Sequence, residues 1–333
     1  MLEHGGKLRR AAEHFDIPLQ DWLDLSTGIA PYGFDLPAIP SEAWLRLPET
    51  EDELETAAQG YFGAASLLPV AGSQAAIQML PRLRRPLQVG IVSPCYAEHA
   101  EAWRREGHRL SEFSEFSEGS VPRALDGLDV LVVVNPNNPT GRLLPPEQLL
   151  AWHGRLAERG GWLIVDEAFM DPTPFHSLAP HSHLPGLIVL RSFGKFFGMA
   201  GARLGFVLAE QSLLSVLSDA LGPWPIAGPS RFIGTVLLAD RDGQRRQRER
   251  LLCDSARLAQ LLSEHGLPPA GGCGLFHWVV TEEATMLREF LACQGILVRR
   301  FLYPPSVRFG LPADEAGWAR LTRALSSYQA LSA

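Results

Sequence analysis

Apolar and polar positions form a repeating alternation of two patterns over the first two thirds of the chain. Short apolar runs rich in β-branched residues occupy 89–92, 129–134, 162–165 and 187–190, and each run is typical of a buried strand. Segments with helical spacing lie between them. Strands that alternate with helices from about residue 54 to residue 210 predict βαβ units. We therefore expect an α/β fold with a mostly parallel sheet and helices on both of its faces.

The pattern changes after Pro225. The spacing predicts a long helix over 244–265, a strand at 276–280, a helix at 285–293 and a strand at 296–298. This order is typical of a smaller α+β domain.

The beginning of the chain shows helical spacing and then a Gly- and Pro-rich loop that contains Gly28. Composition leaves open whether this loop closes over a ligand or connects two elements. We predict three parts: an N-terminal arm (1–34) that packs with the small domain, a large α/β domain (35–240) and a small C-terminal α+β domain (241–333).

Composition and charge exclude several classes of protein. The 333 residues are 46% hydrophobic and 20% charged, with a net charge of −7, which disfavours binding to nucleic acid. The basic run 241–250 is interpreted as a solvated helix face. No stretch approaches the length of a membrane span and no apolar leader is visible, so we expect a cytoplasmic enzyme. The four cysteines lack the spacing of a metal site, and we expect no metal and small buried thiols.

A single lysine, Lys195, follows the predicted strand 187–190 within a glycine-rich segment. We expect it on a loop at the end of the strand, where catalytic groups of α/β proteins gather. A lysine in such a place can be desolvated and lose its proton, as an amine must before it attacks a carbonyl carbon. The alternative is an ordinary solvated lysine.

Polar groups also follow the other predicted strands. Tyr96 comes after the strand 89–92, the turn 135–141 comes after the strand 129–134, and Asp166 directly follows the strand 162–165. A buried carboxylate at such a position requires a partner. Gly72 and Ser73 stand at the start of a predicted helix. The free N–H groups there could bind a phosphate, and the alternative is an ordinary capped helix.

Two motifs give these residues a common interpretation. Residues 192–205 match the pattern Ser-x-x-Lys-x-x-Gly-x-x-Gly-x-Arg-x-Gly, and 135–141 match Asn-Pro-x-Asn-Pro-Thr-Gly. In both, the chain resembles fold-type I pyridoxal-phosphate (PLP) enzymes of the aminotransferase class I/II group. The resemblance implies that PLP is the cofactor, that Lys195 binds it covalently, and that Ser192 and Arg203 hold its phosphate.

The same resemblance assigns the remaining cofactor contacts. Tyr96 stacks on the pyridine ring, Asn138 donates a hydrogen bond to its phenolic oxygen, and Asp166 pairs with its ring nitrogen. Phe169 stands where the family often has a tyrosine that also contacts the phenolic oxygen. Lys195, Asp166 and Tyr96 are the candidate catalytic residues. The predicted cofactor-binding set is Gly72, Ser73, Gln74, Tyr96, Asn138, Asp166, Ser192, Lys195 and Arg203.

The resemblance in the N-terminal and C-terminal regions implies which residues bind the substrate. Arg308 matches the arginine that grips a substrate α-carboxylate, and Arg299 matches a second substrate-facing arginine. The segment from His4 to Arg9 resembles the His-Gly-Gly-Asn-Leu-Arg element of threonine-phosphate decarboxylases of cobalamin biosynthesis, with lysine at position 7. Gly28 lies in a second stretch similar to that branch. Arg308, Arg299, His4 and Gly28 are the candidate substrate-binding residues.

The resemblance implies decarboxylation of L-threonine O-3-phosphate to (R)-1-amino-2-propanol O-2-phosphate, by a homodimer. The alternative is a histidinol-phosphate-type aminotransferase. The motif residues serve both reactions, because the choice depends on which bond at Cα stands perpendicular to the cofactor ring.

Overall fold

The computed structural model describes residues 4–50, 52–116 and 119–332, with the side chains of Ser120 and Ser332 excepted. The chain divides into two compact units. The first contains the residues up to Tyr32, Pro139–Arg142 and the residues from Arg248 onward. The second contains 33–138 and 143–247. The division predicted from the sequence stays a prediction, and the structure adds the short excursion at 139–142.

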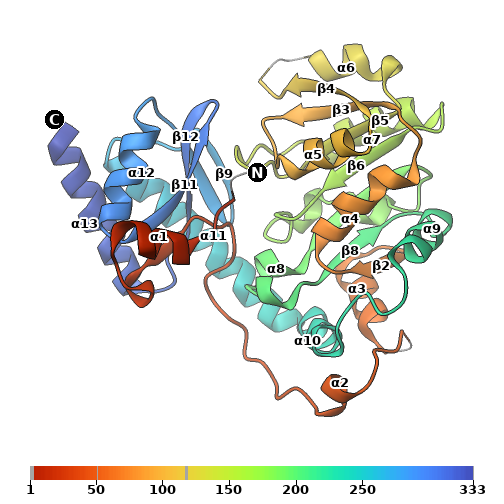
Figure 1. Cartoon of the computed structure of the whole chain (residues 1–333), viewed down its shortest axis with the longest axis horizontal. Coiled ribbons are helices and arrows are strands. Elements are labelled where there is room, and N and C mark those ends of the chain that lie inside the picture. Colours follow the sequence, from red (N-terminus) through yellow and green to blue (C-terminus); the bar gives the residue numbers. More distant parts are fainter. Residues whose placement is uncertain (1–3, 51, 117–118, 333) are drawn as a thin grey trace. The chain divides into compact units, whose positions relative to one another are not determined.

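The second unit is built on a seven-stranded sheet with the order β2-β8-β7-β6-β5-β3-β4 (Figure 1). Strands β4, β3, β5, β6 and β7 pair in parallel, while β8 runs antiparallel to both of its neighbours. The strands are β2 (Leu67–Val70), β3 (Gln88–Ser93), β4 (Arg109–Ser114), β5 (Val130–Val134), β6 (Trp162–Asp166), β7 (Leu187–Ser192) and β8 (Gly205–Leu208). The mostly parallel α/β sheet predicted from the sequence is confirmed.

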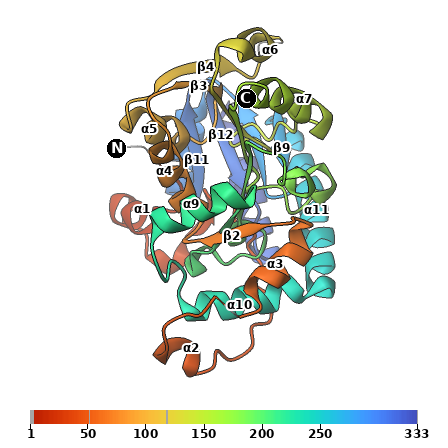
Figure 2. The ribbon, with the colours of Figure 1, turned by 90° about the vertical axis from the view of Figure 1, so that its right-hand side faces the viewer.

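Helices cover both faces of this sheet. Side chains of α4, α5 and α9 share one buried cluster with the strands, and Figure 2 shows α7 on the opposite side of the sheet from α4 and α5. Every residue of β5 and β6 is buried, as expected for parallel strands enclosed on two sides. The helices of this unit are α2 (Glu42–Leu45), α3 (Leu54–Phe62), α4 (Ser73–Met79), α5 (Glu98–Arg105), α6 (Ser120–Ala124), α7 (Pro146–Ala157), α8 (Phe193–Phe196), α9 (Gln211–Leu221) and α10 (Gly228–Ala239).

The first unit contains a five-stranded sheet in which the N-terminal segment takes part. Its order is β1-β11-β12-β10-β9, and β1 pairs in parallel with β11, which lies some 270 residues later in the chain. The strands are β1 (Leu23–Leu25), β9 (Gly271–Cys273), β10 (Phe276–Val280), β11 (Ile296–Leu302) and β12 (Pro305–Gly310). The helices are α1 (Leu8–Phe15), α12 (Ala284–Cys293) and α13 (Glu315–Ser332), and α11 (Arg241–Glu264) passes from the second unit into this one.

Several local predictions were wrong. Lys195 lies on the one-turn helix α8 instead of a loop, because the segment after β7 turns at once into helix. Strand β4 was missed because its alternating polar residues lie at the edge of the sheet. Cys253 and Cys293 are exposed on α11 and α12, so they are not buried thiols. No helix in the described part of the chain has the length and apolar character needed to cross a membrane.

A buried ionic network ties the ends of β6 and β7 together. Arg191 donates to Glu167 at 2.8 Å and to Asp171 at 2.6 Å, and all three side chains are at most 3% exposed. Burial raises the pKa of Glu167, and the charge of Arg191 opposes that rise. The network therefore depends on the arginine to compensate two carboxylates that water does not reach.

Replacing Arg191 by alanine should lower the free energy of unfolding by about 3–5 kcal/mol, because both carboxylates would stay buried without their partner. Urea denaturation measures this loss. Arg104→Ala is the matched control, since its pair with Glu101 is about half exposed and should cost about 1 kcal/mol or less. Equal losses in the two variants would contradict the assigned role of Arg191.

Candidate active site

Three candidate residues follow neighbouring parallel strands in the second unit. Asn138 comes shortly after β5, Asp166 is the last residue of β6, and Lys195 lies on α8 directly after β7. The carboxyl ends of parallel strands meet at one edge of a sheet, so this topology brings the three together. The amine of Lys195 lies 5.5 Å from the centre of the Phe169 ring, which ties it to the loop after β6.

Asp166 is fully supported by hydrogen bonds although it is only 2% exposed. Its Oδ2 lies 2.9 Å from Nε2 of His99, and its Oδ1 accepts a hydrogen bond from the backbone N–H of Ala168 at 3.0 Å. His99 is equally buried, near the start of α5. The carboxylate is therefore held in one orientation by two elements of the fold.

Sequence reasoning missed His99. The available signal was its position three residues after Tyr96, which is itself a predicted site residue. The residue type alone gave no reason to choose it over the other nine histidines.

Tyr96 is influenced by the carboxylates of Glu98 and Asp166 and by the guanidinium of Arg203. Its hydroxyl donates to Oε1 of Gln74 at 3.1 Å, and the amide of Gln74 donates to Glu98 at 3.2 Å. Burial, together with the nearby carboxylates of Glu98 and Asp166, raises the pKa of Tyr96 to about 12, while Arg203 opposes the rise. The phenol is therefore protonated at neutral pH and presents an aromatic face.

Gly72, Ser73 and Arg203 form a cradle of donors at the start of α4. Gly72 has φ +72°, and a Cβ there would lie 2.6 Å from the guanidinium of Arg203. Arg203 itself has φ +49° and adopts the left-handed conformation, so both residues of this contact have a positive φ. Ser192 directly precedes α8 and does not cap it with its side chain. Backbone N–H groups, two hydroxyls and a guanidinium suit a phosphate.

The predicted substrate residues belong to the first unit. Arg308 of β12 is buried, donates to the carbonyl of Ser26 at 3.0 Å, and faces Arg299 of β11 in the strand register. Burial, reinforced by the charge of Arg299, lowers the pKa of Arg308 to about 10. Gly28 is buried in the loop after β1 and does not line the pocket described next.

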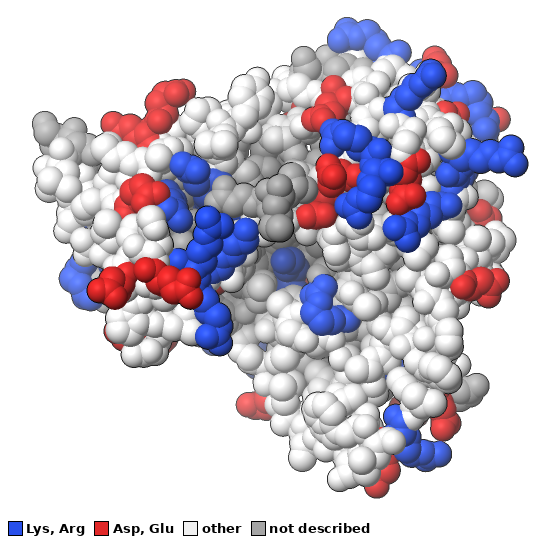
Figure 3. All heavy atoms as spheres, in the orientation of Figure 1, with Lys and Arg blue, Asp and Glu red and all other residues white. Residues whose placement is uncertain are grey.

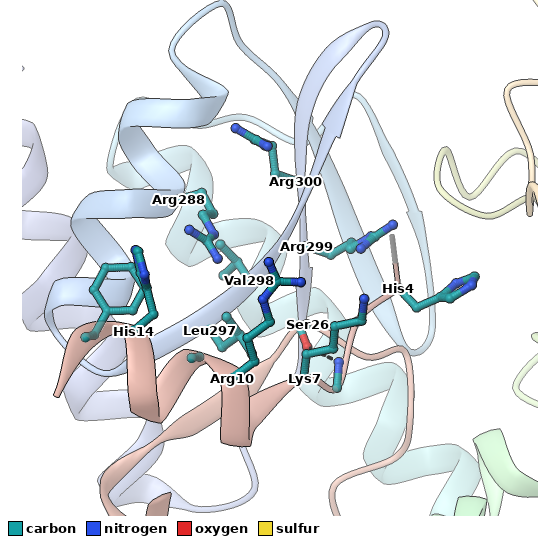
Figure 4. A pocket seen from close by; sticks show the side chains of 14 residues that line it. His4, Lys7, Arg10, His14, Ser26, Arg288, Leu297, Val298, Arg299 and Arg300 are labelled. Atoms are coloured by element: carbon teal, nitrogen blue, oxygen red, sulfur yellow. Dashed lines mark hydrogen bonds between the residues drawn. The ribbon is translucent and has the colours of Figure 1, made fainter. Parts of the chain in front are cut away.

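A basic pocket of about 480 Å³ lies in this unit between α1, α12 and β11. His4 and Arg299 line it together with the backbone of Gly5 and Gly6 (Figure 4). Figure 3 shows positively charged side chains gathered on this face of the unit. The cationic lining residues are Lys7, Arg10, Arg288, Arg299 and Arg300. Apart from Arg299, sequence reasoning did not select them, because they come from three elements distant in the chain.

Comparison of the sequence with family models identifies the family of this chain. The model for aminotransferase class I and II matches residues 38–327. The chain belongs to the aminotransferase class I and II family.

Curated relatives narrow the comparison further. The chain is 62% identical to a threonine-phosphate decarboxylase of Pseudomonas aeruginosa over 99% of this chain and 98% of that protein. It is 42% identical to one of Sinorhizobium sp. over 98% of both chains. Among solved structures, histidinol-phosphate aminotransferase from Sinorhizobium meliloti, in complex with pyridoxal-5'-phosphate, superimposes with a TM-score of 0.82. That likeness covers 100% of this chain and 96% of the other at 21% identity, and it shows the fold.

The residues present fit the PLP of the aminotransferase class I and II family. The cradle at Gly72 and Arg203 has the donors for a phosphate, and a Cβ at Gly72 would displace the guanidinium of Arg203. Asp166 offers a buried carboxylate for a ring nitrogen, and Lys195 offers an amine on the neighbouring strand end. Every predicted cofactor residue lies in the second unit, and every predicted substrate residue lies in the first.

Gly205→Ala should weaken PLP binding by about tenfold to a hundredfold, because overpacking of a tight site costs about 1–3 kcal/mol. A Cβ at Gly205 would lie 2.5 Å from the backbone nitrogen of Ser73 and displace the cradle. Titration of the apoprotein with PLP, followed by visible absorbance, measures the change. Gly201→Ala in the same motif has open space for its Cβ and should bind PLP normally. An unchanged affinity in Gly205→Ala would contradict the cradle.

Proposed function

We infer that this chain is a PLP-dependent threonine-phosphate decarboxylase that converts L-threonine O-3-phosphate to (R)-1-amino-2-propanol O-2-phosphate in cobalamin biosynthesis. The observation that carries this conclusion is the 62% identity to the Pseudomonas aeruginosa enzyme over 99% of the chain. The similarity extends over nearly the whole length of both chains. The reaction breaks the bond between Cα and the carboxylate, releases CO2 and adds a proton to Cα.

The second unit holds the cofactor. Gly72, Ser73 and Gln74 bind its phosphate from the start of α4, and Ser192 and Arg203 bind it from the lysine motif. This assignment is supported by the close approach of Arg203 to Gly72. Tyr96 presents its aromatic face to the ring, while its hydroxyl donates to Gln74. Asn138 donates to the phenolic oxygen, with Phe169 contributing no hydroxyl of its own.

PLP supplies an aldehyde that condenses with amines and a ring that accepts the electron pair left by the departing CO2. Asp166 keeps the ring nitrogen protonated, and His99 and the N–H of Ala168 hold that carboxylate in place. Lys195 would hold the cofactor before the substrate arrives, and its Nζ would then be free to deliver a proton to Cα.

The first unit orients the substrate. Arg308 binds the α-carboxylate through its planar fork, and His4 and Arg299 bind the phosphate. The lowered pKa of Arg308 reflects a burial penalty that an anionic ligand relieves. Two anionic groups held at separate points fix the rotation about the Cα–N bond, and this rotation decides between decarboxylation and transamination.

The first test is incubation of the PLP-loaded protein with L-threonine O-3-phosphate in the absence of any keto acid. Mass spectrometry should detect aminopropanol phosphate and CO2, and Lys195→Ala should reduce turnover by at least about a thousandfold, because both the amine and its proton are lost. Lys195→Ala should also lose the visible absorbance of the lysine-bound cofactor. If L-threonine O-3-phosphate is not turned over, and glutamate or histidinol phosphate converts the cofactor to pyridoxamine phosphate instead, the protein is an aminotransferase.

The cytoplasmic location stays a prediction from the sequence. We also propose that the chain forms a homodimer. Support for the dimer comes from α2 and its surroundings, where Trp44, Leu45 and Leu47 are 66%, 83% and 64% exposed. A cluster of large apolar side chains on a small helix is typical of a surface that a second chain covers.

Sedimentation equilibrium should give twice the chain mass for the wild-type protein. Leu45→Glu should shift it to monomer, because a buried charge in an apolar interface is strongly unfavourable. Leu331→Glu on α13 is the control, since Leu331 is 75% exposed on the first unit. A dimer that survives Leu45→Glu would exclude this surface as the interface.

A further inference from the structure

The basic pocket carries more positive charge than the proposed substrate uses. Its described lining contains five lysine and arginine side chains and no aspartate or glutamate. Of the lining residues, only His4 and Arg299 are assigned to the phosphate of the substrate, and its carboxylate is assigned to Arg308, which lies outside the lining. Crowded cations repel one another, so this arrangement is unfavourable until an anion lies among them.

Three of the unused cations form a group, which we call the basic cluster: Lys7, Arg10 and Arg288. Lys7 directly precedes α1 and Arg10 is the third residue of that helix, and both line the pocket. Arg288 approaches from α12, where it pairs with Glu289 and lies 5.6 Å from the Phe15 ring. Figure 4 shows the side chains of Arg10 and Arg288 extending toward the same space, with Lys7 beside them.

The length of the basic side of α1 indicates the size of the ligand. His14 also lines the pocket, seven residues after Lys7. At 1.5 Å per residue, the stretch from Lys7 to His14 is about 10 Å long. One phosphate group is much shorter than this, whereas a chain of condensed phosphates is long enough to reach several of the lining donors.

We propose that the basic cluster binds a second ligand, a condensed phosphate of two or more phosphoryl groups, either inorganic or carried by a nucleotide. The recognition is electrostatic and relies on charge-assisted hydrogen bonds from the two guanidinium groups and the ammonium. The pocket lies wholly within the first unit, so its ligand binds without any residue of the cofactor site.

The test is calorimetric titration of the PLP-loaded, full-length protein at low ionic strength with tripolyphosphate, ATP, inorganic phosphate and adenosine. Tripolyphosphate and ATP should each bind once per chain and at least about tenfold more tightly than inorganic phosphate, because more charge-assisted bonds form. Adenosine should not bind. Tighter binding of ATP than of tripolyphosphate assigns the ligand to nucleotides, and the reverse order assigns it to inorganic polyphosphate.

Arg10→Ala and Arg288→Ala should each weaken tripolyphosphate binding by about tenfold. Arg9→Ala is the matched control, because Arg9 is an exposed neighbour on the same helix that does not line the pocket. It should change the affinity by less than about twofold, because Arg9 does not line the pocket and so contributes no charge-assisted hydrogen bond to a ligand there. The KM for L-threonine O-3-phosphate should stay within about twofold in all three variants, because the cluster is separate from the assigned substrate contacts.

Three results would overturn the proposal. If tripolyphosphate binds no more tightly than inorganic phosphate, the pocket does not recognise a condensed phosphate. If Arg9→Ala weakens tripolyphosphate binding as much as Arg10→Ala does, the binding is due to general surface charge. A large rise of KM in Arg10→Ala would assign the cluster to the substrate instead. Turnover in the same preparations reports on the decarboxylase separately, because the titration requires no catalysis.

Discussion

The enclosure of the central parallel strands on both faces is the constraint on which the second unit depends. All residues of β5 and β6 are buried, so neither strand has room for a polar side chain along its apolar length. Polar groups first become possible where the strands end. Asp166, Asn138 and Lys195 therefore gather at a single edge of the sheet, and the network of Arg191 with Glu167 and Asp171 keeps the ends of β6 and β7 in register.

The two units handle charge in different ways. In the second unit, charged groups have partners of defined geometry: Asp166 lies against His99, and Arg191 lies against two carboxylates. In the first unit, cations line a pocket whose described walls contain no carboxylate. The first arrangement suits a cofactor that must be held in one orientation. The second suits anionic ligands that arrive from solution and leave again.

Two departures from the family pattern lie at informative places. Phe169 removes a hydroxyl from the cofactor site, and its ring lies 5.5 Å from the Lys195 amine instead. Lys7 replaces an asparagine in the N-terminal element and adds a charge to the basic pocket. Under the proposed function the first change would leave Asn138 as the main donor to the phenolic oxygen, and the second contributes to the excess of positive charge from which the second ligand is inferred.

Local patterns in the sequence were sufficient for the central strands, the α/β class and the family with its cofactor, whereas the roles of the individual cofactor residues stay a prediction. Buried parallel strands are continuous apolar runs, and the residues that bind a cofactor through strand ends and helix starts lie in compact motifs. These features depend on neighbours within about a dozen positions, so they can be recognised before the chain is folded.

Contacts between distant segments were decided by the tertiary structure alone. The pairing of β1 with β11, the excursion of residues 139–142 into the first unit, and the polar edge strand β4 carry no local signal. The same holds for His99 beside Asp166 and for Arg10 opposite Arg288. A charged or polar side chain on a helix has the same local pattern whether it meets water or a partner, so only the packing of the elements distinguishes the two.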